Sequence, residues 1–266
     1  MDRLSITFAA RNILFLSTLC CASSLYALND GPSGNLNPAP QDTNETASLS
    51  PPSLGPEAMG DVLLARRRYV EAIQSYRLEP TQSSSLWNKM GIAQQHLTND
   101  REARRDYERA LNLNPKNAEA TNNLATIFYT QKDYKQAVKL YKRAMKLNPK
   151  CSTVYINLGT AYFAMDKYKK GAEIYRSALA IDPQAFDHDT SASIPEGTPP
   201  HQRAELNYFL AKTYAEAGHN EQALKYLRRA LAQGFSDKKK LMSDKEFVSL
   251  RETPEFRQLL TEEHID

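Results

Sequence analysis

The side chains of this chain that can recognise another molecule are asparagine amides, aromatic rings and lysines. Asn88, Asn122, Asn123 and Asn157 supply the amides. Each amide both donates and accepts hydrogen bonds, so a ladder of asparagines can bind an extended peptide backbone without reading its sequence. Rings such as that of Tyr129 can hold the side chains of the peptide. These residue types favour the binding of a peptide over catalysis.

Catalytic groups are not brought together by any pattern in the sequence. We find no glycine-rich phosphate loop, no cluster of Cys or His ligands, and no Ser–His–Asp or paired-carboxylate arrangement. Asp187-His188-Asp189 is at most half of a metal site, because adjacent residues rarely converge on one ion. We therefore expect no enzyme activity, no catalytic residue, no metal, no cofactor and no small-molecule substrate.

A third set of candidate side chains is basic. Residues 84–185 contain 17 Lys and Arg against 9 Asp and Glu. A solvated surface is the ordinary explanation, and contact with an anionic lipid or polymer is the functional alternative. The overall net charge of +3 is too small to indicate a nucleic-acid partner. The predicted basic face consists of Arg101, Arg105, Lys135, Lys139, Lys142 and Lys146.

The elements that must position these side chains repeat along the chain. Small residues recur at intervals of 31, 34, 34 and 52 residues, at Gly60, Gly91, Ala125, Gly159 and Ala211. Further small positions follow in each unit, with the rings of Tyr107, Tyr141 and Tyr175 before the last of them, and the middle units end at Pro115, Pro149 and Pro183. A period of 34 residues with these features indicates an array of helix–turn–helix units.

Hydrophobic periodicity independently predicts two short amphipathic helices in each unit. In residues 120–130 the apolar side chains recur at three- and four-residue spacing, and the same spacing returns after the turn at Lys132-Asp133. The small residues allow the two helices to approach closely, and the proline ends the second helix. We expect an all-α solenoid.

Written out in full, Trp87 to Pro115 and Tyr155 to Pro183 closely resemble the tetratricopeptide repeat, and the resemblance covers roughly residues 53–235. It implies a right-handed superhelical solenoid of about five units whose first helices line a concave groove for a partner protein or peptide. The asparagines are common in this repeat, so a structural role between repeats is the alternative. The resemblance places on the groove Asn88, Asn122, Asn123, Thr126, Tyr129, Asn157, Thr160, Phe163, Tyr208 and Lys212.

The two ends of the chain differ from the array. Residues 1–27 have the order of a secretory signal peptide, with Arg11 before a short apolar run and a cleavage site after Ala27. Residues 28–56 are rich in polar residues and proline and predict a disordered linker. The array follows at 57–235 with an insertion loop at 186–203, and residues 236–266 resemble a capping segment common in bacterial members of the family.

The expected function is a non-enzymatic protein–protein interaction scaffold of the bacterial cell envelope. The signal peptide predicts an exported protein, periplasmic or secreted, and a retained membrane anchor is the less favoured outcome. The alternative function is an envelope assembly factor that attaches to anionic lipid or polymer through its basic convex face.

Overall fold

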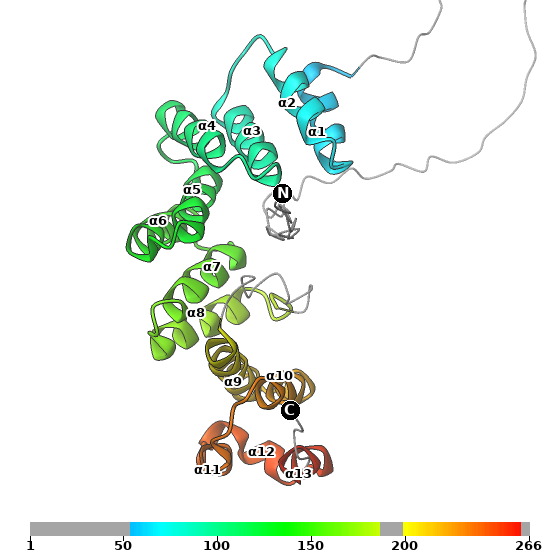
Figure 1. Cartoon of the computed structure of the whole chain (residues 1–266), viewed down its shortest axis with the longest axis vertical. Helices are drawn as coiled ribbons and strands as arrows, with labels where there is room; N and C mark the ends of the chain where they lie inside the picture. The colour runs from blue at the N-terminus through cyan, green and yellow to red at the C-terminus, as the bar shows by residue number, and fades with distance from the viewer. Residues whose placement is uncertain (1–53, 187–198, 262–266) are drawn as a thin grey trace, which may run out of the picture.

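The computed structural model describes residues 54–186 and 199–261, and within them every regular element is a helix. The helices form five consecutive pairs that stack along a curved path (Figure 1). The pairs are α1 (Pro56–Ala65) with α2 (Tyr69–Arg77), α3 (Ser84–His96) with α4 (Asp100–Leu113), α5 (Ala118–Thr130) with α6 (Tyr134–Leu147), α7 (Ser152–Phe163) with α8 (Tyr168–Ile181), and α9 (Pro200–Glu216) with α10 (Asn220–Ala232).

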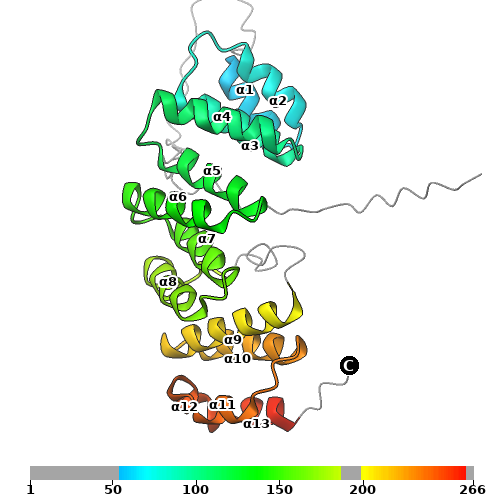
Figure 2. The same cartoon turned by 60° about the vertical axis from the view of Figure 1, so that its left-hand side comes forward.

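The two helices of a pair lie on different sides of the curve. In Figure 1, α3, α5 and α7 lie toward its inside, and α4, α6 and α8 lie toward its outside. Figure 2 shows the same order of stacking from a second direction. We call the helices that come first in their pairs the first helices, their partners the second helices, and the surface of α3, α5 and α7 inside the curve the inner face.

The small residues predicted to allow close packing lie directly beneath tyrosine rings. A Cβ atom on Gly159 would lie 2.3 Å from the ring of Tyr175, far inside van der Waals contact. The same relation holds for Gly60 beneath Tyr76, at 2.3 Å. Each of these rings therefore packs against the backbone of the first helix, and glycine allows the closest approach.

The turn inside each pair contains one residue with a left-handed backbone. These residues recur at the spacing of the repeat, and only the last of them is glycine. The following N–H group donates to a carbonyl oxygen five residues earlier, as in Asn99 to Gln94 and Asp133 to Phe128, which closes the end of the first helix. The left-handed residues are Arg67, Thr98, Lys132, Asp166 and Gly218.

The two departures from the period have different structural outcomes. In the first unit, α2 has 9 residues whereas α4 has 14, as the early Pro80 predicts. After α8, the predicted insertion loop is shorter than expected: Phe186 is fully buried, and Pro200 begins α9 because proline suits the first turn of a helix. Residues 187–198, which include Asp187-His188-Asp189, lie outside the described residues.

Short helices cover the carboxy-terminal end of the array. They are α11 (Lys238–Ser243), the 3₁₀ helix η2 (Lys245–Phe247), α12 (Val248–Arg251) and α13 (Pro254–Thr261). Their apolar side chains join the hydrophobic core of α9 and α10, and they include Leu241, Phe247, Leu250, Phe256 and Leu259. We call these short helices the cap.

The predicted signal peptide and nearly all of the predicted linker lie outside the described residues. Among the helices that the structure does describe, none combines the length and the apolar character needed to cross a membrane.

Candidate partner-binding site

The asparagines predicted to bind a partner form hydrogen bonds with one another across the repeat junctions. Asn123 of α5 donates from Nδ2 to Asn88 Oδ1 of α3 at 3.0 Å, and Asn157 of α7 donates to Asn122 Oδ1 of α5 at 3.0 Å. Within α5, Asn122 donates to Asn123 Oδ1 at 3.2 Å. The four side chains thus form one continuous series of donors and acceptors, which we call the asparagine ladder.

The members of the ladder differ in how far a partner can reach them. Asn88 is 2% exposed and Asn122 is 7% exposed, so both are occupied in holding neighbouring repeats together. Asn123 and Asn157 are half-buried. Each of these two amides retains a second N–H beyond the bond that it donates within the ladder. Asn88 and Asn122 therefore have the structural role between repeats. Asn123 and Asn157 share this role and can also bond to a partner.

At the junction between the first and second units, the residues at the same two positions of the repeat are in contact, and there they are charged. Lys89 of α3 lies 2.9 Å from Glu57 Oε1 and 2.7 Å from Asp61 Oδ2, both on α1. Glu57 stands three residues before the first small residue of its unit, and Lys89 stands two residues before that of the next. The same two positions are occupied by the hydrogen-bonded pairs of the ladder, Asn88 with Asn123 and Asn122 with Asn157. This ion pair was not predicted from the sequence, although the repeat period contains the signal.

The predicted threonines are used inside their own repeats. Thr126 Oγ1 lies 3.0 Å from the hydroxyl of Tyr141, and Thr160 Oγ1 lies 2.8 Å from the hydroxyl of Tyr175. Burial raises the pKa of both tyrosines, so both are neutral hydroxyls at physiological pH. These bonds join the first helix to the second and leave Thr160 buried.

Tyr129 is the predicted residue with the most capacity left for a partner. It lies on α5 and is half-buried, with its ring centroid 5.3 Å from that of Tyr134. Its hydroxyl forms no hydrogen bond with any residue that the structure describes, and it is not fully enclosed. Burial raises the pKa of Tyr129, so the hydroxyl stays protonated and can donate.

The structure corrects the prediction for Phe163. Its side chain is only 3% exposed, and the ring lies over Gly171 of α8, where a Cβ atom would approach it to 2.6 Å. The ring centroid is also 5.2 Å from that of Tyr175. Phe163 therefore belongs to the core between α7 and α8 and offers little surface to a partner.

Tyr208 and Lys212 hold the cap instead of lining an open surface, which corrects a second part of the prediction. Tyr208 is fully buried, stacks on Phe235 with ring centroids 4.4 Å apart, and donates its hydroxyl to Asp244. Lys212 Nζ lies 3.1 Å from Asp244 Oδ2 and 3.2 Å from Glu246 Oε2. The cap covers the positions that the repeat pattern would leave for a partner.

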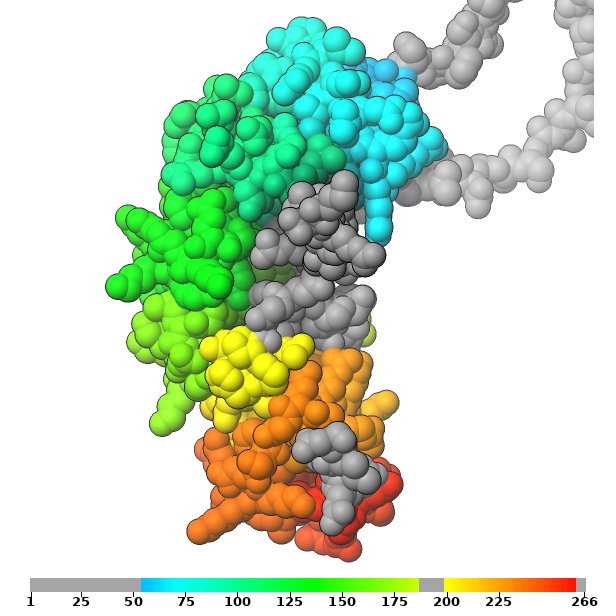
Figure 3. All heavy atoms as spheres, viewed as in Figure 1, coloured from blue at the N-terminus to red at the C-terminus, as the bar shows by residue number. Residues whose placement is uncertain are grey.

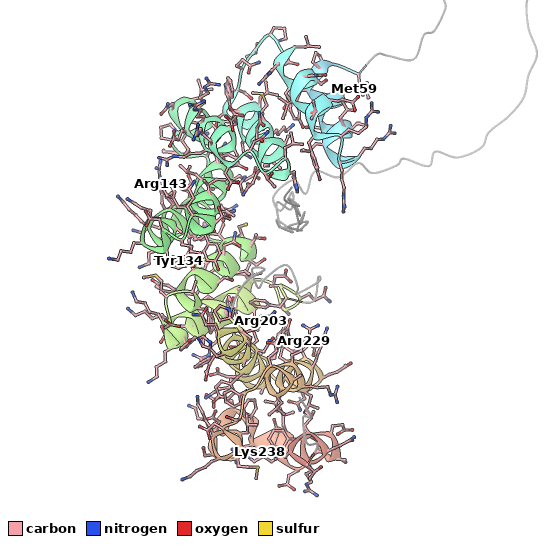
Figure 4. The ribbon with its side chains drawn as sticks, in the orientation of Figure 1. Met59, Tyr134, Arg143, Arg203, Arg229 and Lys238 are labelled. Atoms are coloured by element: carbon pink, nitrogen blue, oxygen red, sulfur yellow. The ribbon has the colours of Figure 1, made fainter. Side chains whose placement is uncertain are left out.

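All six residues of the predicted basic face are exposed, on the second helices α4 and α6. None of them forms an ion pair with another described residue; Lys142 Nζ lies 5.7 Å from the ring centroid of Tyr162. Figure 4 shows the neighbouring Arg143 at the outer edge of α6. These side chains are therefore available on the outside of the curve.

The charge of the two helices is nevertheless different. The sequence of α4 contains four acidic residues beside its four arginines, and Arg104 pairs with Glu108 at 2.8 Å. The sequence of α6 contains five basic residues and no acidic residue. The local excess of positive charge thus lies mainly on α6.

Within residues 54–186 and 199–261, no three His, Cys, Asp or Glu side chains are grouped as metal ligands. Cys151 is half-buried in the turn before α7.

One model of the tetratricopeptide repeat matches residues 82–150 and 118–184, and a second model of the same repeat matches residues 204–232. No curated protein matches the sequence. A crystal structure of MamA is similar, with 20% identity over 66% of this chain and 94% of that chain and a TM-score of 0.45. YrrB, described as a TPR protein with an unusual peptide-binding site, has 19% identity over 67% of this chain and 84% of that chain and a TM-score of 0.44.

Proposed function

Because the chain is a tetratricopeptide repeat protein, we propose that it is a non-enzymatic scaffold that binds an extended segment of a partner protein across the inner face of α5 and α7. One observation carries this proposal. Asn123, Tyr129 and Asn157 lie half-buried on neighbouring first helices, and each has hydrogen-bonding capacity left over. Amides and a phenolic hydroxyl suit the backbone of an extended peptide.

The ladder prepares these groups for binding. Asn123 and Asn157 are already fixed by their bonds to Asn88 and Asn122, so a partner does not have to immobilise them. Ordering a free polar side chain on binding costs about 0.5–1.5 kcal/mol, and a side chain that is already ordered avoids much of this cost. The ladder therefore supports both the fold and the proposed recognition.

We further propose that the scaffold works in the bacterial cell envelope. The order of Arg11, the apolar run and Ala27 supports export and cleavage. Mass spectrometry of the mature protein should find an amino terminus near Leu28. An intact Met1 in the cytoplasmic fraction would contradict this location.

A photocrosslinking experiment can test the binding surface in the full chain. A photoreactive phenylalanine in place of Tyr129 should capture the partner from cells, and the same group in place of Lys139 on α6 should not. Equal capture from both positions, or capture only at position 139, would exclude the inner face.

The affinity of the captured partner then gives a second test. Tyr129→Phe removes one hydroxyl and should weaken binding about 2- to 10-fold, the usual effect of one hydrogen bond. Tyr162→Phe is the matched control, because it removes a hydroxyl from a buried ring beside Lys142. The proposal fails if the two variants bind alike. Asn123→Ala and Asn157→Ala are unsuitable here, since the ladder couples them to folding.

A further inference from the structure

Helix α6 presents a row of lysines on a single face. Lys135, Lys139, Lys142 and Lys146 follow one another at intervals of four, three and four residues, which places them along one side of a helix. All four are exposed. We call them the lysine stripe. Arg143 lies beside the stripe, and its guanidinium donates to the carbonyl oxygen of Pro115.

The neighbouring second helices carry less net positive charge than α6. In α4 the arginines alternate with acidic residues, and Arg109 lies 3.6 Å from Asp106. In α8 the basic residues are accompanied by Glu173, and Arg176 pairs with Glu216 at 2.5 Å. Among α4, α6 and α8, the net positive charge is therefore largest on α6.

The position of α6 makes it the first part of the outer side to meet a flat object. In Figures 1 and 3, α6 lies at the outermost bulge of the curve, with α4 and α8 set back on either side. A flat surface that approaches a convex one touches its highest point first. The lysine stripe lies on the helix at that point.

The chemistry of α6 fits a surface of spread negative charge better than it fits a protein. Protein interfaces depend on buried aromatic and apolar anchors and are poor in lysine. The large apolar residues that are exposed in the described part of the chain include none from α6, whose Ala137, Tyr141 and Ala144 face the core. Lysine is a compact charge on a flexible stem, which suits mobile head groups.

We propose that the lysine stripe of α6 docks the protein on a membrane that contains anionic lipid, without insertion into the bilayer. The apolar side of α6 is already buried in the array, so the contact is electrostatic. This surface is separate from the inner face, and docking through it leaves α5 and α7 free on the side away from the bilayer. The proposal does not depend on the partner-binding function.

Vesicle sedimentation of the full chain tests this proposal. The protein should bind vesicles of phosphatidylcholine with phosphatidylglycerol, should not bind phosphatidylcholine alone, and should be released in molar salt, where charges are screened within about 3 Å. Lys135→Gln with Lys139→Gln should weaken binding about 25-fold, because each lysine near an anionic surface contributes about fivefold.

A matched control lies on α4. Arg101 and Arg105 stand 34 residues before Lys135 and Lys139, so Arg101→Gln with Arg105→Gln removes the same charge from the equivalent positions. This variant should bind within about twofold of the unchanged chain, since its surroundings are already neutralised. Lys135→Arg with Lys139→Arg should restore binding, which separates charge from any effect on folding.

Several outcomes would overturn the proposal. Equal weakening by the α4 and α6 variants would show attraction to net charge alone. Equal binding to phosphatidylcholine vesicles, or binding that survives molar salt, would show insertion elsewhere. Stronger binding to soluble polyphosphate than to the mixed vesicles would assign the stripe to a linear polyanion. The variant Lys135→Gln with Lys139→Gln should bind the inner-face partner with unchanged affinity. A negative result in the vesicle experiment would therefore leave the proposed partner binding intact.

Discussion

The first three repeat junctions and the fourth use the same positions and different chemistry. At the first junction Lys89 forms ion pairs with α1, and at the second and third the asparagine ladder connects α3, α5 and α7. At the fourth junction the equivalent residues are Ile156 and Phe209, both of which pack in one apolar core cluster. The array thus changes from polar to apolar contacts at the insertion.

Aromatic rings dominate this fourth junction. The ring centroid of Phe186 lies 4.8 Å from that of Tyr175 in α8 and 6.2 Å from that of Tyr214 in α9. Tyr226 of α10 donates its hydroxyl to the carbonyl oxygen of Phe186 at 3.1 Å. Phe186 therefore fills the space between the fourth and fifth units.

The difference shows what each kind of contact requires. A hydrogen bond depends on distance and angle, so amides can connect repeats only where the period brings them to the same register. Apolar packing depends mainly on buried area and tolerates a change of register. The insertion interrupts the 34-residue period, and aromatic side chains pack across this junction instead of hydrogen-bonded amides.

The largest predicted effect is at the aromatic junction. Phe186→Ala should destabilise the protein by about 3–5 kcal/mol, because it removes a fully buried ring and leaves a cavity. Hydrogen exchange should show lost protection in α8, α9 and α10, while α3 to α6 keep theirs. An equal loss along the whole array would mean that the two kinds of junction unfold as one unit.

Substitutions at the polar junctions should lower the free energy of unfolding by a smaller amount. Asn123→Ala should cost about 1–3 kcal/mol, since it leaves the buried amide of Asn88 without its donor. In urea titrations, Asn88→Ala with Asn123→Ala should cost less than the sum of the two single changes. Additive effects would show that the two amides do not stabilise the junction together.

Asp106 of α4 gives the polar half of the array its own response to acidity. Burial raises the pKa of Asp106 from 3.8 to about 6, and Arg109 and Arg77 offset this only in part. The folded state then binds this proton more tightly than the unfolded state does, so the contribution of Asp106 to stability rises as the pH falls from 7 toward 4. Its size is about 1–3 kcal/mol.

Comparison with Asp106→Asn isolates this effect, because the variant should be more stable at pH 7 and lack the rise. Burial and the charge of Arg67 lower the pKa of His96, which acts in the opposite direction below about pH 6.5 in both proteins. Thermal melts at each pH should converge near pH 4. A constant difference at every pH would contradict the assignment.

The smallest predicted effect compares the turns of the two halves. Thr98 has φ of +60° and Gly218 has φ of +80°, at equivalent places in their repeats. Thr98→Gly should stabilise the protein by about 1 kcal/mol, and Gly218→Thr should destabilise it by about 1–2 kcal/mol, because a β-branched residue is strained there. A Cβ atom at Gly218 meets nothing within 4 Å, so the melting temperature of Gly218→Thr reports backbone strain without a steric clash of that atom.

The sequence was sufficient for the helix pairs, because their contacts are local and repeat. The small residues, the tyrosine rings and the prolines each have one place in the period, and in the structure the glycines lie beneath the rings. The left-handed turns were not predicted, since residues as different as Thr98 and Asp166 occupy them.

The candidate site was less predictable. An amide serves a neighbouring repeat or a partner equally well, so no pattern in one sequence separates the two roles of Asn123 and Asn157. Phe163 and Tyr208 were misplaced because their burial depends on a glycine of α8 and on the cap, which lie outside the first-helix pattern. The difference in net charge between α4 and α6 could have been predicted by counting their acidic residues as well as their basic residues.

The cap gives the described array two unlike ends. At the amino-terminal end, Met59 is 40% exposed at a position where Met90 and Leu158 are almost completely buried against the preceding unit. At the other end, α11 to α13 occupy the place of a following repeat. Head-to-tail growth into a filament needs complementary surfaces at both ends. Because the cap occupies one of these places, the described array leaves a face for repeat stacking open at its amino-terminal end and covers the one at its carboxy-terminal end.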